Sequence, residues 1–280
     1  MFLITGANGQ LGLCFKDLLG ANGALYTDAA DLDITDYTAL EPFTQKHTFK
    51  AIINCAAYTN VDKAEEEPEL AYKINAIGPA NLARLSARLG VPLIHISTDY
   101  VFDGVSHAPL TEDDPVRPLG VYGKTKRAGE EAVLNQAYTA AVIRTAWLYS
   151  PYGKNFVKTM LNLGRTKDEI RVVADQIGTP TYAPHLAEAI LHLLPRIKKG
   201  EKKLYHFTDE GVASWYDLAY YAVRQAGLKA RVWPIATCEY PTKAVRPAFS
   251  LLNKSRIKKE FDLQIDHWTK GVDECLRKLS

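Results

Sequence analysis

A glycine-rich turn near the start of the chain constrains the fold more than any other feature of the sequence. A short, mostly apolar run, Phe2 to Thr5, leads into the segment GANGQLG at residues 6–12, and leucines at helical spacing follow it. Glycines spaced GxxGxxG let the backbone turn tightly and approach a pyrophosphate, which then sits at the positive N-terminus of the helix. A plain glycine turn is the alternative. The order strand, turn and helix favours a dinucleotide site formed by Gly6, Asn8, Gly9, Gln10, Leu11 and Gly12.

Strands and helices alternate over the first half of the chain. Apolar runs predict strands and amphipathic segments between them predict helices, of which the longest covers residues 70–89 and stops at Gly90. Such alternation is typical of a parallel sheet with right-handed crossovers. We therefore expect an α/β fold of the Rossmann type, a doubly wound parallel sheet whose strands cover residues 2–5, 24–27, 51–54, 93–96 and 141–145.

The regular alternation loosens after residue 147, where a second, smaller part of the chain begins. Shorter helices and strands are predicted at residues 155–163, 170–173, 184–194 and 204–207. A helix opened by Ser214 and Asp217 in a capping-box pattern follows, and a helix over residues 268–279 closes the chain. We expect a dinucleotide-binding Rossmann domain at residues 1–150 and a smaller C-terminal α/β substrate-binding lobe at residues 151–280, with segments that can interleave.

The composition excludes several functional classes. With 47% hydrophobic and 24% charged residues among 280, the chain is expected to be globular, and its formal charge of +2 is too small to indicate nucleic-acid binding. No apolar run approaches the roughly 18 residues of a membrane span, so no membrane association is expected. Cys14, Cys55, Cys238 and Cys275 lie far apart without CxxC spacing, which predicts free thiols, no metal site and a cytoplasmic location.

An acidic residue after the second predicted strand bears on the choice of cofactor. Asp28 lies sixteen positions after Gly12, where a carboxylate can accept hydrogen bonds from a ribose diol. Its charge would repel a 2′-phosphate, and Ala29 and Ala30 offer no cation to hold one. NADH is therefore favoured over NADPH, with dual use left open.

Further candidates for the cofactor site follow the second and third strands. Asp33 and Ile34 either contact the adenine, through its exocyclic amine and its ring face, or belong to a plain loop. Asn75, a polar residue on the long helix, is expected to hold a water or a backbone carbonyl near the site. Small residues after the third strand leave room for the cofactor, and this segment is Cys55, Ala56, Ala57 and Tyr58.

The segment from residue 97 to residue 126 carries the chemistry. Thr98 follows an apolar run, so its hydroxyl is expected at the carboxyl edge of the sheet, where open α/β sheets bind ligands. Tyr122 and Lys126 are four residues apart in a helical segment, which places both side chains on one face. A surface helix with a solvated lysine is the alternative. Of the 15 tyrosines in the chain, however, only Tyr122 has a lysine four positions on.

These side chains suit the reduction of a carbonyl. If a nicotinamide lies along the sheet edge, hydride transfer leaves negative charge on the carbonyl oxygen, which then needs an acid. Tyr122 can give the proton, and the Lys126 ammonium is expected to lower the phenol pKa from its usual value of about 10. Lys126 can also bind the nicotinamide ribose, Thr98 can hold the carbonyl in line, and Asn75 can complete a relay to solvent.

Segments distributed over almost the whole chain resemble one family. ITGANGQLG, CAAYTNVDKAE, STDYVFDG, YGKTK, RTAWLY, NFVKTM, VVADQIGTPTY and RPAFSLL together resemble the dTDP-4-dehydrorhamnose reductases of the extended short-chain dehydrogenase/reductase superfamily. The resemblance implies reduction of the 4-keto group of dTDP-4-dehydro-L-rhamnose to dTDP-L-rhamnose by NADH or NADPH, in nucleotide-sugar and surface-polysaccharide biosynthesis. It also makes Thr98, Tyr122 and Lys126 the catalytic residues.

The same resemblance implies which residues bind the substrate. Tyr100 and Trp147 would line the sugar pocket. Arg246 suits a pyrophosphate by its charge, although a surface salt bridge is the commoner fate of an arginine. The residues in segments that contact the nucleotide part of the substrate are Asn155, Gln176, Thr181 and Arg246.

Two departures from the family pattern matter. Some members dimerise through a magnesium site whose glutamate falls at Cys14 here, and a thiol is a poor ligand for that hard cation. We therefore expect a monomer or a weak homodimer without bridging magnesium. Many members carry a basic residue just after the second strand, where this chain has Ala29, and this difference again favours NADH.

Two other functions compete with ketone reduction. A sugar-nucleotide dehydratase or epimerase shares the fold and the Tyr-Lys pair, but a dehydratase needs an acid and a base beside the threonine. Here Asp99 and then Tyr100 follow Thr98, so elimination lacks its second carboxylate. A non-catalytic NAD(P)-binding regulatory subunit would be marked by a damaged Tyr, Lys or glycine turn, and all three are intact in this chain.

Overall fold

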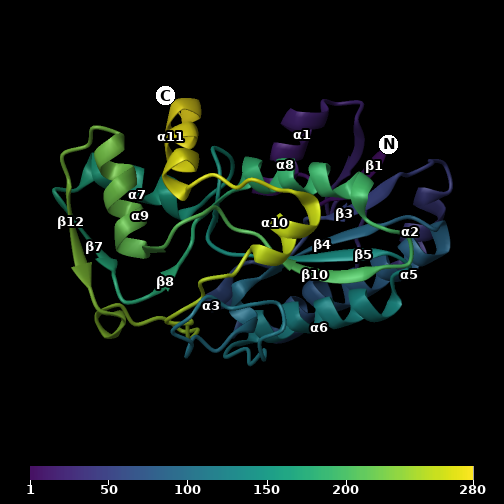
Figure 1. Ribbon diagram of the computed structural model, residues 1–280, viewed down its shortest axis with the longest axis horizontal. Helices are drawn as coiled ribbons and strands as arrows, with labels where there is room; N and C mark the ends of the chain where they lie inside the picture. Colours follow the sequence, from purple (N-terminus) through teal and green to yellow (C-terminus); the bar gives the residue numbers. More distant parts are fainter. Residues whose placement is uncertain (280) are drawn as a thin grey trace.

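One six-stranded sheet forms the centre of the computed structural model, which describes residues 1–279 (Figure 1). The strand order is β2-β1-β3-β4-β5-β10, and every neighbouring pair is parallel. The Rossmann-type fold predicted from the alternating pattern is confirmed. The strands are β1 (Phe2–Thr5), β2 (Ala24–Thr27), β3 (Ala51–Asn54), β4 (Leu93–Thr98), β5 (Ala140–Thr145) and β10 (Lys202–His206).

Helices cover both faces of this sheet. On one face lie α1 (Gln10–Leu19), α8 (Ala183–Leu193) and α10 (Ser255–Phe261), where Phe15 and Ile190 pack against Ile53 of β3. On the other face lie α2 (Tyr37–Thr44), α5 (Gly78–Leu89) and α6 (Val121–Gln136). Figure 1 shows α1 and α8 above the strands and α5 and α6 below them. Because both faces are buried, inner strands such as β3 and β5 read as nearly continuous apolar runs.

The strand order reverses between β1 and β3. The chain goes from β1 to β2 on one side and then crosses to β3 on the other side of β1. Loops that leave the carboxyl ends of two such strands diverge, and the crevice between them is where open α/β sheets bind ligands. The turn after β1 and the short segment after β3 therefore lie at the predicted site.

The long helix expected over residues 70–89 is divided by one π-helical turn. It consists of α4 (Pro68–Tyr72), the turn Lys73–Ile77 and then α5, which ends at Gly90 in a left-handed conformation. Asn75 lies within this turn, fully buried, and its side chain bonds the backbone of Tyr58 on a neighbouring loop. Single π-helical turns are frequent at functional sites, and hydrophobic periodicity does not reveal them.

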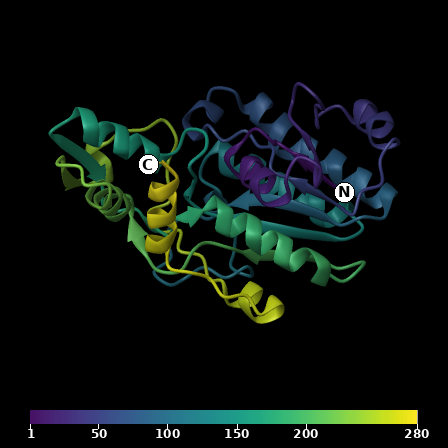
Figure 2. The same ribbon diagram turned by 90° about the horizontal axis from the view of Figure 1, so that it is seen from above.

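The C-terminal part of the chain forms a smaller lobe at one end of the sheet (Figure 2). Its helices α7 (Phe156–Thr166), α9 (Trp215–Gln225) and α11 (Trp268–Leu279) pack around Leu161, Leu218 and Val272. The predicted capping box of Ser214 and Asp217 at the start of α9 is confirmed. The small sheets pair β7 (Glu169–Val173) with β12 (Arg231–Ile235), β8 (Ile177–Gly178) with β11 (Ala213–Ser214), and β6 (Leu148–Tyr149) with β9 (Thr181–Tyr182).

Residues from beyond position 150 also belong to the central sheet. β10 pairs with β5, and α8 packs against α1, although the chain between β5 and α8 builds part of the small lobe. We therefore keep the boundary at residue 150 as a proposal. In it, segments that follow residue 150 also belong to the Rossmann domain. Within residues 1–279, no helix is long and apolar enough to cross a membrane.

Candidate active site

A cavity of about 850 Å³ lies at the carboxyl ends of β1, β3, β4 and β5. It brings together side chains from distant parts of the sequence, from the glycine turn to the start of α9. The predicted site residues that line it are Gly6, Asn8, Gly9, Gln10, Leu11, Asp28, Asp33, Ile34, Cys55, Ala56, Ala57, Thr98, Tyr100, Tyr122, Lys126 and Trp147. Seven predicted residues do not line it, namely Gly12, Tyr58, Asn75, Asn155, Gln176, Thr181 and Arg246.

The glycine turn lies against the segment after β3. Gly6 has a φ of +66°, and a Cβ atom there would come within 2.5 Å of the Ala56 backbone nitrogen. Gly12 lets α1 approach the turn, because a Cβ there would come within 2.5 Å of the Ala7 Cα atom. No side chain at either position is compatible with this geometry. The open backbone at the start of α1 fits a dinucleotide pyrophosphate.

The Asp28 side chain forms a hydrogen bond to the backbone of the glycine turn. One carboxylate oxygen accepts a hydrogen bond from the Asn8 amide at 3.0 Å, and the other accepts one from the Ala29 amide at 2.8 Å. Asp28 therefore lies at the end of β2, next to the turn, as the spacing from Gly12 predicts. Asp33, Ile34 and Leu32 line the same end of the cavity.

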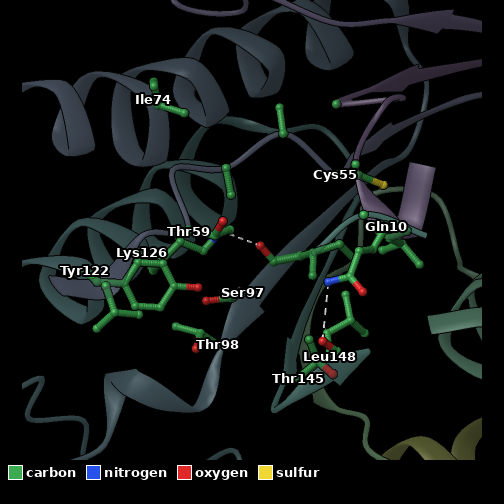
Figure 3. A pocket seen from close by; sticks show the side chains of 18 of the residues that line it. Gln10, Cys55, Thr59, Ile74, Ser97, Thr98, Tyr122, Lys126, Thr145 and Leu148 are labelled. Atoms are coloured by element: carbon green, nitrogen blue, oxygen red, sulfur yellow. Dashed lines mark hydrogen bonds between the residues drawn. The ribbon is translucent and has the colours of Figure 1, made fainter. Parts of the chain in front are cut away.

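Thr98, Tyr122 and Lys126 lie together on the floor of the cavity (Figure 3). Thr98 is the last residue of β4, and Tyr122 and Lys126 project from the first turns of α6. The Lys126 ammonium donates to the Ile96 carbonyl at 2.6 Å, and its side chain is only 2% exposed. The placement predicted for these residues, with a helix face against the strand end, therefore agrees with the structure.

Burial is the main influence on the pKa values of Tyr122 and Lys126. It raises the pKa of Tyr122 to about 12, against a smaller lowering by a hydrogen bond with Thr98. This corrects the expectation that Lys126 lowers the phenol pKa below its usual value, because desolvation of the phenolate is the larger effect. Burial also lowers the pKa of Lys126 to about 8, although Glu130 opposes the change. The phenol consequently keeps its proton at neutral pH, as a proton donor must.

Asn75 supports the site from behind the cavity wall. Its side-chain oxygen accepts from the Tyr58 amide at 2.8 Å, and its nitrogen donates to the Tyr58 carbonyl and to the Thr125 hydroxyl, both at 3.1 Å. The expected hydrogen bond to a backbone carbonyl is present. Since these bonds occupy the Asn75 side chain, it ties the segment after β3 to α6, and the relay to solvent stays a prediction.

Aromatic side chains line the end of the cavity that faces the small lobe. The rings of Tyr100 and Tyr122 meet edge to face with centroids 5.4 Å apart. Trp147 has a φ of +49°, which is strained for any residue except glycine, and its indole stacks on Trp215 at 3.8 Å. Trp215 comes from the start of α9, so the stack joins the sheet to the small lobe.

The residues expected to contact the nucleotide part of the substrate are bonded within the chain. Arg246 forms an ion pair with Asp62 at 2.7 Å. Asn155 caps α7 and donates to Gln10, which itself lines the cavity. Gln176 donates to the Thr237 hydroxyl, and Thr181 accepts from the Thr145 hydroxyl. Their roles in substrate binding stay predictions.

Other residues of the cavity were not recognised as site residues from the sequence. Ser97 and Asp99 flank Thr98 and line the cavity, whereas the sequence pattern connects Asp99 only with the argument against dehydration. Trp215 was recognised only as part of a helix start. Lys73 and Lys154 are cations on the wall of the cavity. Proximity to Thr98 could have indicated the first two, but the pairing of Trp147 with Trp215 depends on tertiary packing that the sequence does not contain.

No metal centre is indicated in the part of the chain that the structure describes. No three His, Cys, Asp or Glu side chains within residues 1–279 gather in a way that could hold an ion. Cys14 is buried between α1 and the core, where burial raises its thiol pKa. The expected absence of a bridging magnesium ion stays a prediction about the protein in solution.

Comparison with known proteins gives consistent full-length matches. The family model described as the RmlD substrate binding domain matches residues 1–280. The spore coat polysaccharide biosynthesis protein SpsK of Bacillus subtilis (strain 168) is 39% identical, with 99% of this chain and 97% of SpsK covered. The dTDP-4-dehydrorhamnose reductase of Aggregatibacter actinomycetemcomitans is 42% identical, with 96% of each chain covered.

Solved structures agree with these sequence matches. The crystal structure of dTDP-4-dehydrorhamnose reductase from Bacillus anthracis str. Ames in complex with NADP superposes with a TM-score of 0.94. Its sequence is 39% identical to this chain, and the alignment covers 99% of this chain and 98% of that one. The similarity therefore extends over both the sheet and the small lobe.

Proposed function

The chain belongs to the RmlD substrate-binding-domain family of dTDP-4-dehydrorhamnose reductases, and we propose that it reduces the 4-keto group of dTDP-4-dehydro-L-rhamnose to dTDP-L-rhamnose with NADH or NADPH. The observation that carries the proposal is the cluster of Thr98, Tyr122 and Lys126 on the cavity floor beside the glycine turn. The product is a nucleotide sugar for polysaccharide biosynthesis.

Each of the three side chains has one part in the reaction. A bound nicotinamide supplies the hydride. Tyr122 donates a proton to the oxygen of the reduced carbonyl, since its raised pKa keeps it neutral until that charge develops. Thr98 donates a hydrogen bond to the same oxygen and holds it in line. Lys126, fixed by the Ile96 carbonyl, anchors the cofactor ribose beside the phenol.

The direct test is turnover of a defined substrate. The oxidation of NADH is followed with the dTDP-4-keto-6-deoxy sugar in the presence of the preceding epimerase. We expect oxidation that depends on both the sugar nucleotide and the epimerase. If NADH binds stoichiometrically but no 4-keto sugar nucleotide is turned over, the chain is instead a non-catalytic binding subunit.

Within this function, we propose a preference for NADH. The Asp28 carboxylate lies beside the Asn8 and Ala29 amides, where a 2′-phosphate would meet its charge. The Bacillus anthracis relative was crystallised with NADP. We therefore propose the preference for NADH for this chain and do not extend it to that relative. Initial rates with the two cofactors at equal concentration test it, and a clear advantage for NADPH would overturn the assignment of Asp28.

We also propose that the chain acts as a monomer or a weak homodimer without bridging magnesium. The burial of Cys14 on the core-facing side of α1 supports this, because the thiol is neither exposed nor a hard ligand. Sedimentation velocity with and without EDTA tests the proposal. A dimer that EDTA dissociates would contradict it.

A further inference from the structure

Asp99 is a buried carboxyl group directly behind the catalytic threonine. It follows β4, is 2% exposed and lines the cavity together with Thr98. One of its oxygens, Oδ1, is 3.0 Å from the Thr98 hydroxyl. The other, Oδ2, makes no well-formed hydrogen bond within residues 1–279, although the Ser250 hydroxyl lies close enough to lower the carboxyl pKa. Neither a surface role nor an ion pair accounts for this group.

The Thr98 hydroxyl has only one proton to donate. An ionised Asp99 can only accept, so the Thr98 proton must then point to Oδ1, away from the cavity. The Thr98 oxygen also accepts from the Tyr100 amide at 3.2 Å. In this state the one proton of Thr98 is held by Asp99, and it is not available to the substrate oxygen or to the neighbouring Tyr122 oxygen.

A protonated Asp99 reverses the direction of this bond. The neutral carboxyl can donate to the Thr98 oxygen, which leaves the Thr98 proton free to point at the substrate. Ketone reduction needs that orientation, because the substrate oxygen gains negative charge and requires donors. An acceptor at this position would instead oppose the developing charge.

We propose that Asp99, in its protonated form, is the positioning residue that turns the Thr98 hydroxyl toward the substrate oxygen. The proposal rests on the reductase function given above, and it concerns the direction of one hydrogen bond. The change between the two states involves one proton, which Asp99 takes up from solvent. The Thr98 hydroxyl then rotates toward the substrate. Ionisation of Asp99 withdraws the hydrogen bond from the substrate.

The surroundings of Asp99 move its titration toward neutral pH, so the protonated form predominates below about pH 6. Burial raises its pKa to about 6, against weaker effects of the Ser250 and Thr98 hydroxyls and of two backbone amides. The titratable groups that face it are the phenols of Tyr100 on the same turn and Tyr122 on α6, and burial raises the pKa of both. Two nearby cations have other partners, Lys126 the Ile96 carbonyl and Arg246 the Asp62 carboxylate, while Lys73 and Lys154 lie on the wall of the same cavity.

The test compares the pH dependence of kcat/KM for the wild type and for Asp99→Asn. The wild type should lose about tenfold for each pH unit above the pKa of Asp99, as expected for a single titrating group. The side-chain amide introduced by Asp99→Asn can donate to Thr98 at every pH. The variant should therefore keep its kcat/KM constant from about pH 5.5 to 7.5, up to the separate decline caused by deprotonation of Lys126, whose pKa is about 8.

A second variant separates this role from a structural one. Thr98→Val removes the hydroxyl through which Asp99 acts, so it should be slower by about 100-fold and should lack the same pH limb. Adding Asp99→Asn to Thr98→Val should then change nothing further. If Asp99→Asn fails to fold, judged by thermal denaturation, the pH profile of Thr98→Val alone decides the question.

A readout that does not depend on turnover completes the experiment. The infrared difference spectrum between wild type and Asp99→Asn should show a protonated carboxyl that disappears near the pKa of Asp99. A wild type without turnover overturns the reductase function and this inference with it. An active wild type whose decline between about pH 6 and 7.5 persists in both variants overturns only the inference.

Discussion

The cavity floor and the small lobe differ in how firmly their functional side chains are held in place. Thr98, Tyr122 and Lys126 project from a strand end and a helix that pack directly against each other, and their positions follow from the sheet. The side chains predicted to bind the nucleotide come from loops, from the start of α7 and from the two-residue strand β9. There, Arg246 is paired with Asp62 and Gln176 with Thr237.

This difference sets the catalytic residues apart from the residues predicted to bind the nucleotide. The catalytic group is preorganised, so its contribution to the rate costs little rearrangement when the substrate enters. Arg246 must break its ion pair with Asp62 before it can bind a phosphate. The binding free energy of the substrate therefore gains only the difference between the new ion pair and the old one. We therefore expect large effects on kcat from the floor and smaller effects on KM from the lobe.

Removal of the phenol should give the largest effect. Tyr122→Phe deletes the proton donor but keeps the ring, so kcat should fall by about 10²- to 10⁴-fold while NADH binding is retained. Tyr138→Phe, at an exposed tyrosine after the same helix, is the matched control and should be unaffected. Turnover and NADH fluorescence titration measure the two quantities, and undiminished turnover in Tyr122→Phe would remove this residue from the acid role.

Loss of the buried ammonium should rank second. Lys126→Met removes the charge held by the Ile96 carbonyl, so both NADH affinity and kcat should fall, by about tenfold to 100-fold in kcat/KM. The control is Lys124→Met, because Lys124 is exposed on the same helix. Equal effects of Lys126→Met and Lys124→Met would show that the buried ammonium of Lys126 contributes no more to NADH binding and turnover than an exposed lysine does.

The Arg246–Asp62 pair allows a sharper test of the lobe, with an expected effect of about tenfold. Arg246→Gln should raise KM for the sugar nucleotide, because it removes the cation that meets the pyrophosphate. Asp62→Asn breaks the same ion pair but frees Arg246, so it should leave KM unchanged or lower it. If both variants raise KM equally, the pair is structural and Arg246 does not bind substrate.

The smallest expected effect concerns the cofactor. Asp28→Asn removes the charge that would repel a 2′-phosphate but keeps an acceptor beside the Asn8 amide. The ratio of kcat/KM for NADPH to that for NADH should rise by a few-fold, in keeping with roughly 1 kcal/mol for one partly exposed charge. A constant ratio would show that Asp28 only holds the turn.

The same comparison explains how much the sequence could predict. Helical periodicity was sufficient to place Tyr122 beside Lys126, and the apolar run of β4 was sufficient to place Thr98 at the sheet edge. Periodicity does not reveal burial of an individual polar group, so neither the neutral tendency of Asp99 nor the high pKa of Tyr122 was foreseen. The Trp147–Trp215 stack depends on how the lobe packs, which local patterns do not encode.

The position of β10 in the sequence has a consequence for synthesis of the chain. Because β10 (Lys202–His206) pairs with β5, the sheet lacks its sixth strand until residue 206 has left the ribosome. Until then β5 is an open edge that can pair with other chains. A fragment that ends at residue 150 keeps this edge permanently, and α1 lacks α8 as its packing partner. Expression of the first 150 residues alone should therefore give aggregates rather than a cofactor-binding domain.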